Sequence, residues 1–243
     1  MAGLALVLAG CDATAPKLPE KPSKAEASEF PEADRPVATI VSARWSTEEA
    51  RDRLNESEEV MDRAGIAKGM TVADIGAGEG YYTIRLAQRV GADGRVLAED
   101  IVPEVRDALA RRVARERLDN VSVRLGMADD PRLPEASFDR VLMVHMYHEI
   151  ANPYAFLWHL RPSLRPDGLV VVVDANRATQ NHGTPPALLR CEFEAVGYRQ
   201  VAMRPMPSAG GYLTTFQAVG PRPEPKAIRP CRLDPAAKAA AAR

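Results

Sequence analysis

A glycine-rich segment, Asp74-Ile-Gly-Ala-Gly-Glu-Gly80, follows a short apolar run and precedes a stretch with helical periodicity. Side chains would keep a ligand away from a tight strand-to-helix turn, so Gly76 and Gly78 suit a backbone that approaches a ligand closely. The third glycine comes one residue earlier than in the dinucleotide pattern G-x-G-x-x-G, which argues against a nicotinamide oxidoreductase. The segment predicts a different cofactor site, formed by Asp74, Gly76, Ala77, Gly78 and Gly80.

A second polar segment, His145-Met-Tyr-His-Glu149, ends the fourth expected strand. Ligands of doubly wound sheets bind beyond the carboxyl ends of the strands, so these side chains should face the reacting atoms. His148 is the first candidate for a general base, followed by His145 and Tyr147. Each histidine could instead cap the next helix or bond to the backbone. The order His-x-x-His-Glu fits neither H-E-x-x-H nor H-x-x-E-H, so no metal site is predicted.

A third polar cluster follows the fifth expected strand, with Asp174-Ala-Asn-Arg177 and then Asn181-His-Gly183. The segment is long and is bounded by proline. It predicts either a lid over a bound substrate, with Asp174 as a polar contact, or a solvated loop in which Asp174 caps the backbone.

Apolar runs alternate with amphipathic stretches along most of the chain. The expected strands are residues 71–75, 96–100, 121–125, 141–144, 169–174, 198–203 and 212–219. The expected helices are residues 47–64, 81–90, a stretch from Pro103, 153–164 and 186–195, the first of them opened by a capping box at Ser46 and Glu49. This alternation predicts an α/β, Rossmann-like doubly wound sheet of about seven strands, mostly parallel, with an antiparallel hairpin at its C-terminal end.

Asp74 to Gly80 resembles the first motif of the class I S-adenosylmethionine-dependent methyltransferases, and later motifs keep the order of that family. The resemblance implies S-adenosylmethionine as cofactor and methyl transfer by in-line displacement. Such a reaction mainly requires that the acceptor be held in line with the methyl group. The acceptor is expected to be a small molecule, since no aromatic and basic constellation indicates a nucleic acid.

The resemblance also assigns the remaining cofactor residues. Gly94 to Asp100 resembles the second-strand motif, in which the terminal acid, Asp100, binds the ribose hydroxyls with Ile101 beside it. Gly126-Met-Ala-Asp-Asp130 resembles the loop that cups the adenine, with Ala128 in the loop and Asp129 accepting from the exocyclic amine. Glu99 is expected to face the opposite side of the strand.

The composition of the chain divides it into four parts, residues 1–11, 12–45, 46–220 and 221–243. Its 243 residues carry 32 Lys and Arg against 33 Asp and Glu, which gives no global attraction to nucleic acid. Residues 46–220 are expected to form the methyltransferase domain with its N-terminal helix. Residues 12–45 are rich in Pro, Ala and Glu and predict a linker, and residues 221–243 predict a tail.

The first eleven residues are apolar, and Leu8-Ala-Gly-Cys11 resembles the lipobox of bacterial lipoproteins. The resemblance implies a lipidated Cys11 and a membrane-anchored protein of the cell envelope. The missing Lys or Arg at the start departs from a signal peptide and leaves a cytoplasmic enzyme as the alternative. A second alternative is a non-catalytic, membrane-anchored binding or scaffolding protein that keeps the fold. Cys191 and Cys231 could pair in an oxidising compartment, but unpaired thiols are slightly favoured.

Overall fold

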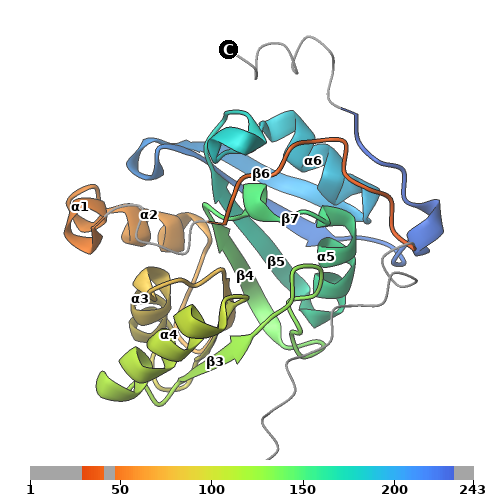
Figure 1. The fold of residues 1–243 in the computed structure, drawn as a ribbon. Helices are drawn as coiled ribbons and strands as arrows, with labels where there is room; N and C mark the ends of the chain where they lie inside the picture. Colours follow the sequence, from red (N-terminus) through yellow and green to blue (C-terminus); the bar gives the residue numbers. More distant parts are fainter. Residues whose placement is uncertain (1–28, 41–46, 233–243) are drawn as a thin grey trace, which may run out of the picture.

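One mixed sheet of seven strands, in the order β3-β2-β1-β4-β5-β7-β6, forms the centre of the protein (Figure 1). The computed structural model describes residues 29–40 and 47–232. Strands β1 to β5 pair in parallel, and β7 pairs antiparallel with both β5 and β6. The predicted α/β fold is therefore confirmed, including its antiparallel C-terminal hairpin. The strands are β1 Thr71–Ile75, β2 Arg95–Asp100, β3 Val121–Leu125, β4 Phe138–Val144, β5 Leu164–Asp174, β6 Tyr198–Met206 and β7 Gly211–Ala218.

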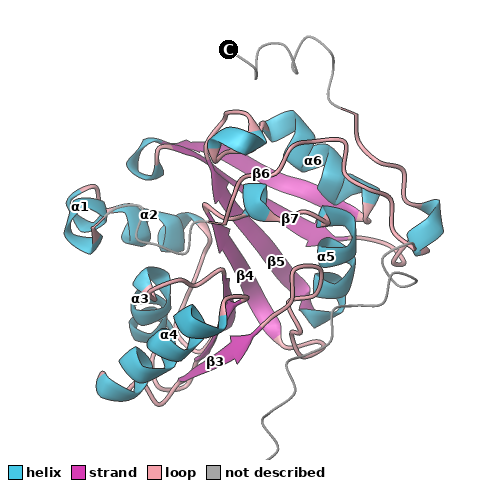
Figure 2. Ribbon diagram, viewed as in Figure 1, coloured by secondary structure: helices cyan, strands magenta, loops and turns pink. Residues whose placement is uncertain are grey.

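Helices cover both faces of the sheet (Figure 2). They are α1 Glu48–Arg53, α2 Glu56–Arg63, α3 Tyr81–Val90, α4 Pro103–Arg115, α5 Pro153–Leu160 and α6 Pro186–Ala195. Side chains of α2 and α3 pack on one face of the sheet, and side chains of α5 and α6 pack on the other. Val170 and Val172 of β5 pack with the side chains of α5 and α6, whereas Val171 and Val173 pack with those of α2 and α3. This strand is covered on both faces, which explains why its sequence is continuously apolar.

The expected helix over residues 47–64 is wrong in one respect, because the structure divides it into α1 and α2. The break lies at Asn55, whose φ of 55° is left-handed, a conformation that asparagine adopts more readily than most residues. Thr47 is the N-cap of α1, and its side chain accepts a hydrogen bond from the backbone N–H of Ala50 at 3.1 Å. The expected cap, Ser46, lies outside the described residues.

Residues 29–40, here called the N-terminal segment, pack on the domain although the sequence places them in a linker. Figure 1 shows this segment crossing past α6 towards the carboxyl end of β4. Arg35 is 7% exposed, and its Nε donates to Oε1 of Glu192 in α6 at 2.8 Å. The N–H of Ala38 donates to the carbonyl oxygen of His148 at 3.2 Å. The ion pair offsets the cost of burying the guanidinium, and it fixes the segment beside the end of β4.

A disulfide joins Cys191 of α6 to Cys231, so the expectation of unpaired thiols is wrong. The N–H of Cys231 also donates to the hydroxyl of Tyr154 at 2.6 Å. Part of the predicted tail is therefore held against the domain. Among the described residues, the structure has no helix of the length and hydrophobicity that a membrane span requires. Cys11 and the lipobox lie outside these residues.

Candidate active site

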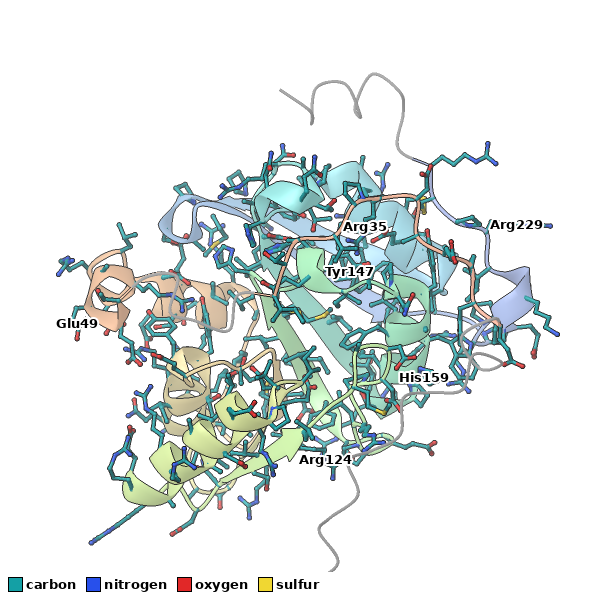
Figure 3. All side chains as sticks on the ribbon, viewed as in Figure 1. Arg35, Glu49, Arg124, Tyr147, His159 and Arg229 are labelled. Carbon is teal, nitrogen blue, oxygen red and sulfur yellow. A yellow bond between two sulfur atoms is a disulfide. The ribbon has the colours of Figure 1, made fainter. Side chains whose placement is uncertain are left out.

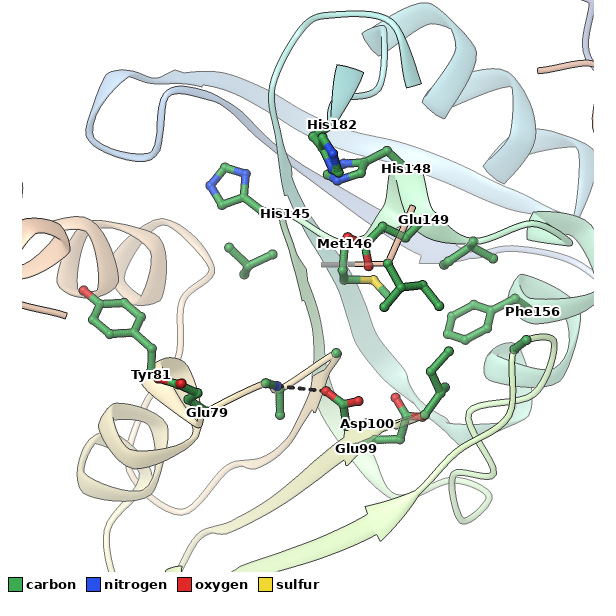
Figure 4. Close-up of a pocket in the computed structure, with 18 of the residues that line it drawn as sticks. Glu79, Tyr81, Glu99, Asp100, His145, Met146, His148, Glu149, Phe156 and His182 are labelled. Atoms are coloured by element: carbon green, nitrogen blue, oxygen red, sulfur yellow. Dashed lines mark hydrogen bonds between the residues drawn. The ribbon is translucent and has the colours of Figure 1, made fainter. Parts of the chain in front are cut away.

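A cavity of about 570 Å³ opens at the carboxyl ends of β1, β2 and β4, which is the size range of small-molecule and cofactor sites (Figure 4). Six of the nine predicted cofactor residues line it: Gly76, Ala77, Gly78, Asp100, Ile101 and Ala128. His145 and His148 line the same cavity. The structure thus brings the glycine turn and two predicted catalytic residues to one enclosed space.

The glycine turn leaves the cavity wall free of side chains. Gly76 and Gly78 have φ angles of 65° and 56°, in the left-handed region where glycine carries no steric penalty. No described atom lies within 4 Å of the position that a Cβ would take at Gly78. At Gly76 a Cβ would lie 3.1 Å from Cγ of Met146. A ligand can therefore approach the backbone at Gly78, and the sequence needs glycine at both positions.

Asp100 ties the end of β2 to this turn. Its Oδ2 accepts a hydrogen bond from the N–H of Gly78 at 3.0 Å, drawn as the dashed line in Figure 4. Its Oδ1 accepts from the N–H of Val102 at 2.9 Å. Each carboxylate oxygen has two lone pairs, so both can still accept a hydrogen bond from a ligand. Asp100 thus presents an oriented pair of acceptors at the cavity wall.

Glu99 also lines the cavity, so the expectation that it faces away is wrong. The room for it comes from Gly126, where a Cβ would lie 1.5 Å from Oε1 of Glu99. Burial, followed by the charge of Asp100, raises the pKa of Glu99 to about 8. The Glu99 side chain is therefore a neutral acid at pH 7. Its Oε1 has no hydrogen-bond partner among the described residues.

Three predicted cofactor residues, Asp74, Gly80 and Asp129, are not among those that line the cavity. Asp74 is buried at the end of β1, where Oδ2 accepts from the hydroxyl of Thr83 at 2.6 Å, and burial raises its pKa to about 6. Gly80 permits close packing of α3 on α4, since a Cβ there would lie 2.4 Å from Cδ1 of Leu109. The backbone oxygen of Asp129 accepts from Nδ1 of His159 at 2.8 Å.

Four residues form the opposite wall of the cavity, here called the histidine wall: His145, His148, Glu149 and His182. Figure 4 shows His148 and His182 side by side at one end of the cavity, with Glu99 and Asp100 at the other. His182 comes from the loop after β5, for which the sequence predicts either a lid or a solvated loop. His145 has a left-handed φ of 54°, and burial lowers its pKa.

Asp174, at the end of β5, determines which nitrogen of His148 faces the cavity. Nδ1 of His148 lies 3.0 Å from Oδ1 and 3.1 Å from Oδ2 of Asp174. The carboxylate also accepts from the hydroxyl of Thr184 at 2.7 Å and from the N–H of Ala175 at 2.8 Å. Opposite a carboxylate oxygen that accepts, Nδ1 of a neutral His148 imidazole is the nitrogen that carries the hydrogen. The lone pair of Nε2 is then left for the cavity.

Tyr147 is not among the residues that line the cavity, so it does not fit the role of general base for which the sequence made it a candidate. It is fully buried, and its hydroxyl donates to Oε2 of Glu192 at 2.7 Å. Figure 3 shows it next to Arg35, whose guanidinium carbon lies 5.5 Å from the centre of the ring. Tyr147 and His148 are neighbours in a short 3-10 turn, but Tyr147 bonds to Glu192 whereas His148 lines the cavity.

Two cavity residues come from segments that no sequence motif connects with the site. Arg51 of α1 lines the cavity and lies 3.8 Å above the ring of Tyr81. Ile40, at the end of the N-terminal segment, is also at the cavity. Both residues precede the glycine turn by more than twenty residues, so no pattern of residue spacing predicts that they lie near the turn.

Comparison with known proteins finds relatives for the part of the chain that contains the glycine turn. Residues 72–168 match the sequence profile described as a methyltransferase domain. The chain is 31% identical over 111 residues to protein-L-isoaspartate O-methyltransferase of Methanothrix thermoacetophila, covering 46% of this chain and 50% of the relative. It is 34% identical over 117 residues to nocamycin O-methyltransferase of Saccharothrix syringae, covering 46% and 40%. Residues 72–168 are therefore similar in sequence to a methyltransferase domain.

The solved structures agree with this similarity at the level of the fold. A SAM-dependent methyltransferase from Aquifex aeolicus superimposes with a TM-score of 0.60 at 23% identity, covering 70% of this chain and 97% of that one. The predicted methyltransferase-like fold is confirmed. The match of residues 72–168 to the methyltransferase profile supports S-adenosylmethionine as the cofactor. The chain spans about half the length of the curated relatives that it matches.

The cavity fits this cofactor in its chemistry. S-adenosylmethionine has an adenine, a ribose with two hydroxyls, a sulfonium and an amino-acid end. The bare turn at Gly78 admits it, and Asp100 has lone pairs for two hydroxyl donors. Arg51 is a cation at the cavity wall and would suit the carboxylate of the amino-acid end.

Proposed function

We propose that this chain transfers a methyl group from S-adenosylmethionine to a small-molecule acceptor that binds against the histidine wall. One observation carries the proposal: a single cavity joins the glycine turn to the oriented His148–Asp174 pair. A site that only bound the cofactor would have no need of a histidine whose free lone pair is held towards the same space.

When bound, S-adenosylmethionine supplies a methyl group that is activated by its sulfonium. The bond from sulfur to the methyl carbon breaks as the bond from the acceptor to that carbon forms. The products are S-adenosylhomocysteine, the methylated acceptor and a proton. In this proposal Nε2 of His148 engages the proton of the acceptor, and the contact of Nδ1 with Asp174 supports it by orienting the ring. Met146, Ile150 and Phe156 line the cavity with apolar surface that excludes water.

The proposed acceptor carries an O–H, N–H or S–H group, because a base is useful only where the nucleophile loses a proton. The relatives are named for different acceptors, among them a protein isoaspartate, nocamycin and demethylmenaquinone, so they support no single substrate. The net charge of −1 favours a small molecule over a nucleic acid.

The test combines cofactor binding with methyl transfer. Calorimetric titration of the chain should show binding of both S-adenosylmethionine and S-adenosylhomocysteine. Incubation of the chain with methyl-labelled cofactor and fractionated small molecules should then label an acceptor. His148→Gln should slow this transfer by about 10² to 10⁴-fold with an unchanged cofactor Kd.

His159→Gln is the matched control, because His159 is not among the residues that line the cavity and glutamine keeps a donor for the Asp129 carbonyl. Failure to bind the cofactor would refute the proposed function. Cofactor binding without transfer to any fraction would instead support the non-catalytic binding protein.

We also propose that the protein is a lipoprotein of the cell envelope, anchored through Cys11. The lipobox motif supports this, and so does the Cys191–Cys231 disulfide, since such bonds persist mainly in oxidising compartments. Fractionation of cells that express the natural gene should place the protein with membranes and Cys11→Ser in the soluble fraction. Equal solubility of the two proteins would contradict the anchor.

A further inference from the structure

The histidine wall contains three side chains that converge as metal ligands do. His148, Glu149 and His182 each offer one ligand atom, and the three atoms lie within 4.8 Å of one another. All three residues line the cavity. We propose that they bind a divalent transition-metal ion, with Zn²⁺ as the best match, in the acceptor half of the cavity. This proposal deepens the proposed function, since it concerns the same site.

The donor set suits such an ion. Two imidazole nitrogens and one carboxylate are the ligands of many catalytic zinc sites, which keep a fourth position open for water or substrate. Zn–N and Zn–O bonds of about 2.0–2.2 Å place tetrahedral ligands roughly 3.4 Å apart. The ligand atoms lie within 4.8 Å of one another, so the distances between them would need to shorten by up to about 1.4 Å, which side-chain rotation provides. The open position would face the cavity.

The surroundings of His148 support the same conclusion. Metal-bound histidines almost always donate their other ring N–H to a carboxylate or carbonyl, which fixes the tautomer and increases the basicity of the ligand. Nδ1 of His148 has this partner in Asp174, which is fully buried. The lone pair of Nε2 is the one that a metal ion requires.

Asp174 also holds the loop that carries His182. Its Oδ2 accepts from the hydroxyl of Thr184, two residues after His182. The intervening Gly183 has no room for a side chain, because a Cβ would lie 2.4 Å from Cγ of Arg177. His182 itself has a left-handed φ of 55°, a strained conformation that is concentrated at functional sites. One buried carboxylate thus positions two of the three ligands.

A bound ion changes how the acceptor is activated. The lone pair of Nε2 of His148 then binds the ion, and the ion, as a Lewis acid, replaces His148 as the group that activates the acceptor. Coordination lowers the pKa of an acceptor hydroxyl or thiol, and its proton passes to solvent. The substrate class narrows to molecules that bind a metal ion as an oxyanion or thiolate. The order His-x-x-His-Glu gave no such prediction, because the third ligand is 33 residues further along the chain.

The experiment is a calorimetric titration of the metal-free, full-length chain with Zn²⁺ alone. One ion per chain should bind with a Kd of micromolar or below. His182→Ala and Glu149→Gln should each raise this Kd at least tenfold, and Asp174→Asn should raise it about 10 to 100-fold. His159→Ala should leave it unchanged, because His159 is outside the cluster. The affinity for S-adenosylhomocysteine, measured in parallel, reports whether each variant is folded.

Co²⁺ gives a second readout, because its visible absorption depends on the ligands and on their geometry. The wild-type chain should show the intense bands of a four- or five-coordinate site, and His182→Ala should lose them. Absence of Zn²⁺ binding, or equal affinity in wild type and both ligand variants, would overturn the metal site. If S-adenosylhomocysteine still binds in that case, the metal proposal alone has failed; if it does not, the proposed function fails as well.

Discussion

Glu99→Gln should make the free energy of unfolding less dependent on pH. The glutamic acid is 1% exposed at the end of β2, and burial is the main reason why its pKa is raised from 4.5 to about 8. In the unfolded chain the same group ionises near 4.5. The folded state therefore retains a proton that the unfolded state loses. Its contribution to stability is fully present below pH 4.5 and is lost as the pH rises towards 8.

The size of this effect follows from the shift. Each pH unit between the two pKa values costs up to about 1.4 kcal/mol, so the loss from pH 4.5 to pH 7 is on the order of 3 kcal/mol. Glutamine resembles the protonated acid in shape but does not titrate. The stability of Glu99→Gln relative to wild type should therefore rise by this amount over the same interval.

Urea unfolding of both proteins, followed by circular dichroism from pH 4.5 to pH 8 without cofactor, measures the difference directly. Glu135→Gln is the control, because Glu135 is an exposed carboxylate in the loop before β4. The free energy of unfolding of Glu135→Gln relative to wild type should hardly change with pH. If the difference in unfolding free energy between Glu99→Gln and wild type stays constant with pH, the argument is refuted, because Glu99 would then ionise alike in the folded and unfolded states.

Three further predictions concern the cofactor turn and the disulfide. Asp100→Ala should weaken binding of S-adenosylmethionine by about 1.5–3 kcal/mol in calorimetry, and an unchanged Kd would exclude Asp100 as a cofactor ligand. Gly78→Val should abolish this binding while the protein still melts cooperatively, with a stability loss near 1–2 kcal/mol from the left-handed backbone; normal binding would show that the turn does not approach the ligand. Cys191→Ser should reduce the free energy of unfolding by about 4 kcal/mol, because the bond closes a loop of 40 residues. Equal urea midpoints for Cys191→Ser and the oxidised wild type would contradict that estimate.

The features that the sequence could predict are those that local rules determine. The continuous apolar run in β5 and the glycines before α3 fixed the sheet and the position of the cofactor turn. The rule that ligands bind beyond the carboxyl ends of strands placed His148 at the cavity. The same rule indicated the loop that carries His182 as part of the site, but it did not predict that His182 lies beside His148.

The errors arise where the outcome depends on contacts between distant residues. Alternation along β2 put Glu99 on the wrong side, because the cavity lies beyond the strand end and Gly126 makes room there. The N-terminal segment has the composition of a linker, yet the buried Arg35–Glu192 pair anchors it. Cys191 and Cys231 have a spacing that indicates no pairing, and only the packing of residues after β7 on α6 brings them together.

Helix α6 receives both ends of the described chain. Arg35 binds Glu192 near one end of that chain, Cys231 is bonded to the adjacent Cys191 near the other, and Asp34 forms a bridge with Arg232. In mechanical terms, both ends of the described chain are attached to the same helix, α6. A force applied to the N-terminal end would act first on the Arg35–Glu192 ion pair, and a force on the C-terminal end would act first on the disulfide. The strands of the sheet would bear the force only after these attachments had failed. The cavity, formed at the strand ends, would be shielded from tension that enters through a tether.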